Sequence, residues 1–414
     1  MTIACFPARH IRNRNALRTP FYGKEELRVI SLERFAEAWA EIRSWPGYAR
    51  TPLISLPRLA DRLGLGSIHH KDEGQRFGLK SFKALGGAYA VLRVVQRFLA
   101  ERRGFPTIGA AALIAGDHRE LCRDVTVACA TDGNHGRSVA WGAHMFGCQC
   151  KIYLHENVSR AREGEISSYG AEIVRVAGSY DDSVRQCASH AMANGWVLIA
   201  DTSGGGGDPS IPSMVMQGYT VMAQEILDQL PGQAITHVYI PGGVGGLAAA
   251  VAAHLWESSG AQRPRIVVVE PSLADCIYRS IEAGEPTVVP GDVNTFMACL
   301  AAGEVSPLAW PLLKAAVDDV ITLPDEASAE TMRLLAGGAS GDRPIVAGES
   351  GAAALAGLVA SALDPVLSAS LGLDLSSKIV VIGSEGATDE ESYLRVVGEP
   401  SEAVQRRADA TKPT

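Results

Sequence analysis

No stretch of this 414-residue sequence approaches the ~18 uninterrupted apolar residues that a membrane-spanning helix requires. The N-terminus, MTIACFPARHIRNRN, also lacks the apolar centre of a secretory signal peptide. Positive charge is not in excess either, because 38 Lys and Arg stand against 46 Asp and Glu, which gives a net charge of −8. We therefore expect neither a membrane nor a nucleic acid as a partner.

Metal-ligand spacings are absent as well. The 8 cysteines contain no CxxC pair, and Cys148 and Cys150 are too close in sequence for a standard zinc knuckle. The 10 histidines show no HExxH or HxH spacing, so we expect no metal site. Thinly spread cysteines are typical of reduced thiols, which predicts a cytoplasmic protein.

Glycine, in contrast, is abundant, with 43 residues, or roughly 10% against the usual ~7%. There is no G-X-Y period and no long Gly/Ser tract, so collagen-like and flexible-linker readings are excluded. Hydrophobic residues make up 47% of the chain, enough for a sizeable core. The glycines gather in short segments, and these segments carry the functional argument.

Short β-branched runs alternate with helical patterns along the chain. The expected strands are Val125–Ala130, Lys151–Leu154, Glu172–Val176, Val197–Ala200, His237–Ile240, Arg265–Glu270 and Lys378–Ile382, with a short one at Ser67–His69. The expected helical stretches include Val91–Arg103, Leu247–Glu257 and Ala352–Leu363, whereas Pro365–Ser377 is expected to be a loop and 401–414 a frayed tail. Most strands are apolar on both faces, which is typical of a parallel sheet. The alternation predicts an open α/β fold with right-handed crossovers.

Four glycine-containing clusters each follow an expected strand. They are Lys71–Gly87, Ala130–Ala143, Ile240–Ala250 and Val381–Asp389. The first runs into a helix with Lys80 and Lys83 near its start, and the second offers Asp132, Asn134 and His135 as polar groups. Ligands of open α/β sheets bind at the carboxyl ends of strands, so all four clusters are candidate binding segments.

Of two nucleotide-binding motifs that resemble these clusters, only one fits the sequence. Leu79 separates Gly78 from Lys80, so the first cluster does not fit a P-loop. The third cluster fits GxGxx[GA] from Gly243, and Glu270 stands close to where a ribose-binding acid is expected. An NAD-dependent dehydrogenase therefore stays open as an alternative at this point.

One cofactor would use all four clusters at once. Pyridoxal 5′-phosphate (PLP) carries an aldehyde, a phenolic oxygen, a phosphate and a ring nitrogen. A lysine binds the aldehyde, a glycine-rich helix start binds the phosphate, and asparagine and serine can contact the other two groups. A single dinucleotide motif explains only the third cluster.

These motifs resemble the fold-type II PLP enzymes, the group of the serine/threonine dehydratases and the tryptophan synthase β chain. Within that family they are most similar to the diaminopropionate ammonia-lyases. The matching stretches are TPL (51–53), KDEGQRFGL, SFKALGGAYA, ATDGNHGRSVAWGA, IPSMVMQGY (211–219), ADCIY (274–278), AGESGAAALAG (347–357) and SEGATD, which span most of the chain. The resemblance implies an α/β fold of two open, twisted, mostly parallel sheets flanked by helices. It also implies a large domain (1–90 and 217–414) and a small domain (91–216) with PLP between them, and a homodimer.

The resemblance assigns roles to particular residues. It implies that Lys83 binds PLP covalently, Phe82 packs near the ring, Asn134 contacts the phenolic oxygen, Ser384 contacts the ring nitrogen, and Gly242, Gly243, Val244, Gly245 and Gly246 cradle the phosphate. Cys276 and Cys299 fall in stretches expected near the mouth of the site. We expect both thiols to be reduced, and a disulfide between them is the alternative.

Acidic residues distinguish the ammonia-lyases from the dehydratases. Asp132 fills a position where dehydratases usually carry serine, and Asp201 resembles a second carboxylate of the lyases. Each is expected to take a proton from Cα or to bind the β-ammonium group of a diamino acid, although Asp132 could instead cap the following helix. The chain departs from the lyase pattern at Gly204–Gly207, where the lyases carry an aromatic, acidic stretch resembling TAWEGYTK.

The expected function is α,β-elimination of 2,3-diaminopropionate, as both the D and L forms, to pyruvate and ammonia. A serine, threonine or hydroxyamino-acid dehydratase on the same scaffold is the nearest alternative. More distant alternatives are the NAD-dependent dehydrogenase and a catalytically silent relative that binds PLP. In each PLP reading the partner is a small amino acid.

Overall fold

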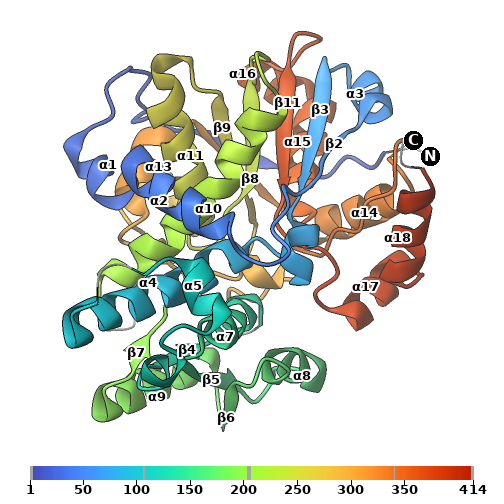
Figure 1. The fold of residues 1–414 in the computed structure, drawn as a ribbon. Helices are drawn as coiled ribbons and strands as arrows, with labels where there is room; N and C mark the ends of the chain where they lie inside the picture. The colour runs from blue at the N-terminus through green and yellow to red at the C-terminus, as the bar shows by residue number, and fades with distance from the viewer. Residues whose placement is uncertain (1–2, 106–107, 132, 203–206, 340, 412–414) are drawn as a thin grey trace. The chain divides into compact units, whose positions relative to one another are not determined.

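The computed structural model describes residues 3–105, 108–131, 133–202, 207–339 and 341–411 (Figure 1). Internal contacts divide the chain into two compact units. The first unit comprises the chain up to Arg28, Arg50–Ser81 and the chain from Met222 onward, and the second unit comprises Val29–Ala49 and Phe82–Val221. The domain limits expected from the sequence stay a prediction, and the contacts group 29–49 with the second unit.

The first unit contains a seven-stranded sheet in the order β1-β10-β9-β8-β11-β3-β2. Its strands are β1 (Arg9–Arg12), β2 (Leu53–Ser55), β3 (Ser67–Asp72), β8 (His237–Pro241), β9 (Arg265–Pro271), β10 (Asp319–Leu323) and β11 (Lys378–Gly383). The five inner strands run parallel, and β1 and β2 pair antiparallel at the two edges. Every residue of β8 and β10 is buried, as is typical of the inner strands of a parallel sheet.

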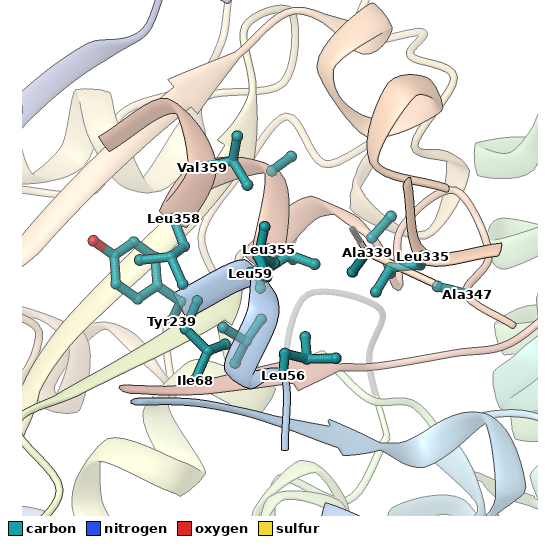
Figure 2. Close-up of a cluster of buried hydrophobic side chains, with 14 of the residues drawn as sticks. Leu56, Leu59, Ile68, Tyr239, Leu335, Ala339, Ala347, Leu355, Leu358 and Val359 are labelled. Carbon is teal, nitrogen blue, oxygen red and sulfur yellow. The ribbon is translucent and has the colours of Figure 1, made fainter. Parts of the chain in front are cut away.

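The helices of this unit are α1 (Lys24–Val29), α3 (Pro57–Leu63), η1 (Glu73–Gly78), α11 (Gly246–Ser259), η2 (Gly260–Gln262), α12 (Cys276–Ala283), η3 (Ala298–Leu300), α13 (Trp310–Ala316), α14 (Asp325–Ala336), α15 (Ala353–Leu363), α16 (Pro365–Leu371), α17 (Glu390–Val397) and α18 (Ser401–Ala410). Among them, α15 packs on the sheet, and α17 and α18 contact other helices. Figure 2 shows the core between α15 and the sheet, where Leu355 and Leu358 lie with Ile68 and Tyr239. A Cβ at Gly357 would come within 2.4 Å of Val269, so glycine there allows α15 to lie close on β9.

The second unit contains a four-stranded parallel sheet in the order β6-β5-β4-β7. Its elements are α2 (Leu32–Ile42), α4 (Lys83–Arg103), α5 (Ala110–Ala115), α6 (Arg119–Cys122), β4 (Thr126–Ala130), α7 (Asn134–Phe146), β5 (Gln149–His155), α8 (Arg160–Ser167), β6 (Glu172–Val176), α9 (Tyr180–Asn194), β7 (Val197–Leu198) and α10 (Ser210–Gln229), which continues into the first unit. Helices α4 and α7 touch closely, since a Cβ at Gly142 would lie 2.8 Å from Cα of Ala88.

The α/β fold with two mostly parallel sheets is confirmed, but two loop predictions were wrong. The tail after Pro400 is not frayed throughout, because 401–410 form α18, which buries Val404 and Ala408. Ser401 anchors its start by donating from its N–H and its hydroxyl to the Glu390 carboxylate at 2.7 and 2.6 Å. Within the expected loop 365–377, α16 forms because Asp364 caps it by accepting from the N–H groups of Val366 and Leu367.

Within the described ranges, no single helix is long and apolar enough to cross a membrane. The pair α15 and α16 passes the length and hydropathy criteria only when taken together, and it bends by 107° between its two helices.

Candidate active site

Lys83 begins α4, and its ammonium group is paired with a carboxylate. Its Nζ donates to Oδ2 of Asp201, which follows β7, and the two side chains are 19% and 20% exposed. Burial alone would raise the pKa of the Asp201 carboxyl, but the charge of Lys83 holds that pKa well below its usual value. The structure thus brings together two of the predicted catalytic residues.

Two aromatic side chains, Phe82 and Tyr219, lie near the same lysine. The ring of Phe82 is 5.5 Å from Lys83 Nζ and packs edge-on against Tyr219 with 4.8 Å between ring centres. Both rings are buried. Tyr219 belongs to the IPSMVMQGY stretch, to which the sequence analysis assigned no role.

His135 also faces Asp201. Its Nδ1 lies 4.0 Å from Oδ2 of Asp201, and its Nε2 lies 3.0 Å from the carbonyl oxygen of Ile199. Burial lowers the pKa of the His135 imidazole, although the nearby carboxylate opposes that shift. Asp201 therefore sits between a lysine and a buried histidine.

The turn between β4 and α7 is shaped by Thr131. Its hydroxyl accepts hydrogen bonds of 3.0 Å from the N–H groups of both Gly133 and Gly136. Asn134 opens α7, and its Oδ1 accepts from Arg137 Nη2 at 3.2 Å. Asp132 lies outside the described residues, as does most of Gly204–Gly207, so the predictions made for them stay predictions.

In the first unit, the glycine loop joins β8 to α11. Gly243 and Gly245 adopt left-handed backbone angles, with φ of 66° and 92°, which glycine tolerates without strain. Gly246 is the first residue of α11, and no side chain caps the N–H groups at that helix start. Uncapped N–H groups at the start of a buried helix form an anion-binding cradle.

Ser384 follows β11 in a turn held by buried partners. Its hydroxyl donates to the carbonyl oxygen of Ser350 at 3.4 Å. The neighbouring Glu385 carboxylate accepts from the Ser350 N–H at 3.2 Å and from the Thr388 hydroxyl at 3.3 Å. Ser350 lies in the AGESGAAALAG stretch, so the structure shows that this motif supports the Ser384 turn.

Glu270 does not serve as the ribose-binding acid of the dinucleotide alternative. Its side chain is fully buried and accepts from the N–H groups of Ile277 and Tyr278 at 2.9 and 2.8 Å. A ribose cannot reach a carboxyl that is enclosed and bonded in this way. The geometry therefore argues against the NAD-dependent reading.

The residues present fit PLP. Taken by itself, the second unit contains Lys83 at a helix start beside an aromatic ring. Taken by itself, the first unit contains a glycine loop with uncapped N–H groups at the start of α11. A Cβ at Gly242 would lie 2.6 Å from Glu270 Cγ, so only glycine allows the start of the loop to pack this closely on β9. A single neutral hydroxyl at Ser384 matches a pyridine nitrogen.

Three further features of the described residues are a hollow, the state of the cysteines and the lack of a metal-ligand cluster. A hollow of about 440 Å³ in the second unit is lined by residues of α6, α7, β5 and β6, among them Arg119, His144 and Lys151, and by none of the predicted site residues. None of the eight cysteines, Cys276 and Cys299 included, forms a disulfide. Among the described residues, no group of three or more His, Cys, Asp or Glu is arranged to hold a metal ion.

Comparisons with known proteins agree with this geometry. The family model described as pyridoxal-phosphate dependent enzyme matches residues 44–384. The diaminopropionate ammonia-lyase of Salmonella typhimurium is 38% identical over 373 residues, which is 87% of this chain and 91% of that relative. A crystal structure of holo diaminopropionate ammonia lyase from Escherichia coli superposes with a TM-score of 0.86 and 34% identity, covering 97% of this chain and all of the other. The Escherichia coli enzyme in complex with D-serine gives a TM-score of 0.85 at 33% identity, with the same coverage.

Proposed function

The chain belongs to the pyridoxal-phosphate dependent enzyme family, and on that premise we propose that it is a carbon–nitrogen lyase that converts 2,3-diaminopropionate, in both enantiomers, to pyruvate and ammonia. The observation that carries the proposal is the pairing of Lys83 with Asp201, a lysine at the start of α4 held by an ionised carboxylate. The relatives that are 38% identical bear the same activity in their names.

PLP, when bound, withdraws electrons from Cα of the amino acid and so acidifies its proton. Lys83 would hold the cofactor covalently, and its amine is the group that would move a proton at Cα. Phe82 excludes water from one side of the lysine because its buried ring lies 5.5 Å from Nζ. The glycine loop from Gly242 to Gly246 holds the phosphate through backbone N–H groups.

The carboxylates give the site its preference for a diamino acid. Asp201 stays ionised at neutral pH because Lys83 depresses its pKa, so it can bind the β-ammonium group or accept a proton. Asp132 is proposed, from the sequence, to act on the face of Cα opposite Lys83. Two bases on opposite faces would allow one site to process both enantiomers.

Ser384 favours elimination over transamination. A serine hydroxyl is neutral and does not hold a proton on the ring nitrogen as a carboxylate does. The electron withdrawal that the cofactor would supply is then weaker, which disfavours transamination. Expulsion of the β-substituent is favoured under those conditions.

A hydroxyamino-acid dehydratase is the second candidate, because the sequence of 204–207 lacks the aromatic residues that the lyases carry there. The test is a panel of β-amino, β-hydroxy and β-chloro amino acids in both enantiomers, scored for keto acid and ammonia. We expect two ammonia per pyruvate from diaminopropionate. One ammonia per keto acid, released mainly from serine or threonine, would identify the dehydratase, and no keto acid from any substrate would identify a silent relative.

Two further statements belong to the proposal. We propose a homodimer, on the family resemblance, and a cytoplasmic location, which the absence of disulfides among the eight cysteines supports. Sedimentation of the holoenzyme measures the assembly, and a species of monomer mass at micromolar concentration would contradict it.

A further inference from the structure

The carboxyl group of Glu270 joins the end of β9 to the first turn of α12. It accepts hydrogen bonds from the N–H groups of Ile277 (2.9 Å) and Tyr278 (2.8 Å), and its side chain is inaccessible to solvent. Asp275 stands at the N-cap of α12 but makes no capping bond. Its carboxylate binds Arg9 at 3.1 Å and Arg279 at 2.5 Å instead, so the cap of this helix comes from β9.

The residues that Glu270 secures contact the glycine loop. The thiol of Cys276 donates to the carbonyl oxygen of Gly243 at 3.4 Å. A Cβ at Gly245 would lie 3.6 Å from Cδ1 of Ile277, so that side chain packs against the backbone of the loop. The first turn of α12 therefore supports the loop at its two left-handed residues.

Glu270 also supports the loop directly. A Cβ at Gly242 would lie 2.6 Å from Cγ of Glu270, so the loop begins packed on the Glu270 stem. The N–H of Gly242 donates to the carbonyl oxygen of Val269 at 2.8 Å, which ties the same point to β9.

We propose that Glu270 is a positioning residue for the cofactor phosphate. It fixes the first turn of α12 against the glycine loop, and the loop then presents its N–H groups in one arrangement that a phosphate can use. The inference rests on the proposed phosphate role of Gly242–Gly246. Glu270 does not touch the phosphate, and its effect passes through Cys276 and Ile277.

The electrostatics of the position agree with this role. Burial raises the pKa of the Glu270 carboxyl to about 8, although the hydrogen bonds that it accepts from two backbone N–H groups lower this pKa. The carboxyl is therefore mostly neutral at pH 7, and no full negative charge lies behind a loop that binds a dianion.

Pyridoxal, which lacks the phosphate, provides the test. Dissociation constants of PLP and pyridoxal are measured for the apoenzyme by absorbance titration, in the wild type and in Glu270→Ala. We expect Glu270→Ala to weaken PLP about tenfold or more, because two backbone hydrogen bonds are lost, and to leave pyridoxal within about twofold. Asp275→Asn is the matched control, a second buried carboxyl at the same helix start, and it should leave the PLP-to-pyridoxal ratio unchanged.

Several results would overturn the inference. An equal loss for PLP and pyridoxal would show a general fold defect, and no loss would show that Glu270 is irrelevant to the loop. A wild type that binds both ligands equally would overturn the phosphate role of the loop as well, which separates that failure from the failure of Glu270 alone. If Glu270→Ala does not fold, Glu270→Gln keeps one acceptor and should show a smaller loss, about threefold, confined to PLP.

Discussion

Oδ2 of Asp201 accepts a hydrogen bond from Nζ of Lys83 and lies 4.0 Å from Nδ1 of His135. The same carboxylate oxygen therefore faces both the lysine that we propose binds the cofactor and a buried imidazole. An acid in this position is able to control where a proton rests during turnover.

Asp201→Asn should lower kcat for diaminopropionate by about a hundredfold or more, since removal of a proton-transfer group typically costs that much. PLP should stay bound, because Lys83 and the phosphate loop are retained. Steady-state kinetics and the visible absorbance of the cofactor measure the two effects.

Asp208→Asn is the control for that experiment. Asp208 pairs with Arg97 at 2.6 Å and accepts from Ser210, close to the start of α10, and it has no bond to Lys83. Asp208→Asn should keep kcat within about threefold of the wild-type value. If Asp201→Asn is as active as Asp208→Asn, the proposed role of Asp201 in proton transfer is contradicted.

Gly351→Ala should disturb the Ser384 turn. A Cβ at this position would lie 2.0 Å from the carbonyl oxygen of Glu385, which belongs to the backbone and cannot turn aside. We expect a loss of about 1–3 kcal/mol in unfolding free energy, together with a shifted cofactor absorbance maximum. Gly164→Ala, in α8, meets no atom within 4 Å and should be neutral or stabilising by up to about 1 kcal/mol.

Glu225→Gln should destabilise the first unit severely. The carboxylate accepts from Arg76 and Lys71 at 2.7 Å, and all three side chains have no exposed surface. Burial would raise the pKa of Glu225, but the two cations lower it, so the substitution leaves buried charge uncompensated. We expect a loss of about 3–5 kcal/mol in urea unfolding.

The exposed pair of Arg50 and Asp228 is the comparison for that network. Its side chains are 45% and 27% exposed, so Asp228→Asn should cost under about 1 kcal/mol. Similar costs for the two variants would show that the buried network contributes no more than a surface pair.

His70 should make the protein less stable in acid. Its ring is buried against Gly383, and burial lowers the pKa of the imidazole to about 4. The unfolded chain binds the proton near pH 6.5, so the stabilisation is complete above that pH and falls by about 3 kcal/mol as the pH drops toward 4.

Urea unfolding at pH 7.5 and 4.5 measures the contribution of His70. His70→Gln should show a smaller loss between the two pH values than the wild type, whatever its absolute stability. His144→Gln, at an exposed position, should retain the wild-type difference. An unchanged pH difference in His70→Gln would place the acid sensitivity elsewhere.

The cofactor and the fold could be predicted because their signals are local. Each of three features lies in one contiguous strand-and-turn segment: Lys83, the glycine loop and Ser384. A turn of that kind requires particular residue types at neighbouring positions, so it can be recognised in the sequence. The strand predictions at Glu172–Val176 and Arg265–Glu270 agree with β6 and β9 to within a residue.

Contacts between distant segments could not be predicted. No residue near Asp201 in sequence indicates that it contacts Lys83. The position of Glu270 in the sequence suggests a ribose-binding acid, whereas in the structure its carboxyl binds the N–H groups of α12. Helix α18 was missed because its apolar pattern is short, consisting of Val404 and Ala408, and because its start is anchored by the distant Glu390. These contacts join residues that are far apart in the sequence, so a single sequence indicates them only through its resemblance to a family.

The order of strands in the first unit has a consequence for synthesis of the chain. Strand β11 pairs with β3 on one side and β8 on the other, yet most of the polypeptide is translated between β3 and β11. At ~5–20 residues per second, the interval lasts tens of seconds. Once β8 has been made, β3 and β8 each have an open edge, and a nascent chain that stalls before Lys378 exposes both to pairing with other molecules. The ribosome therefore delivers the strand that closes the middle of the sheet almost last, so protection from aggregation falls to chaperones until Gly383 has emerged.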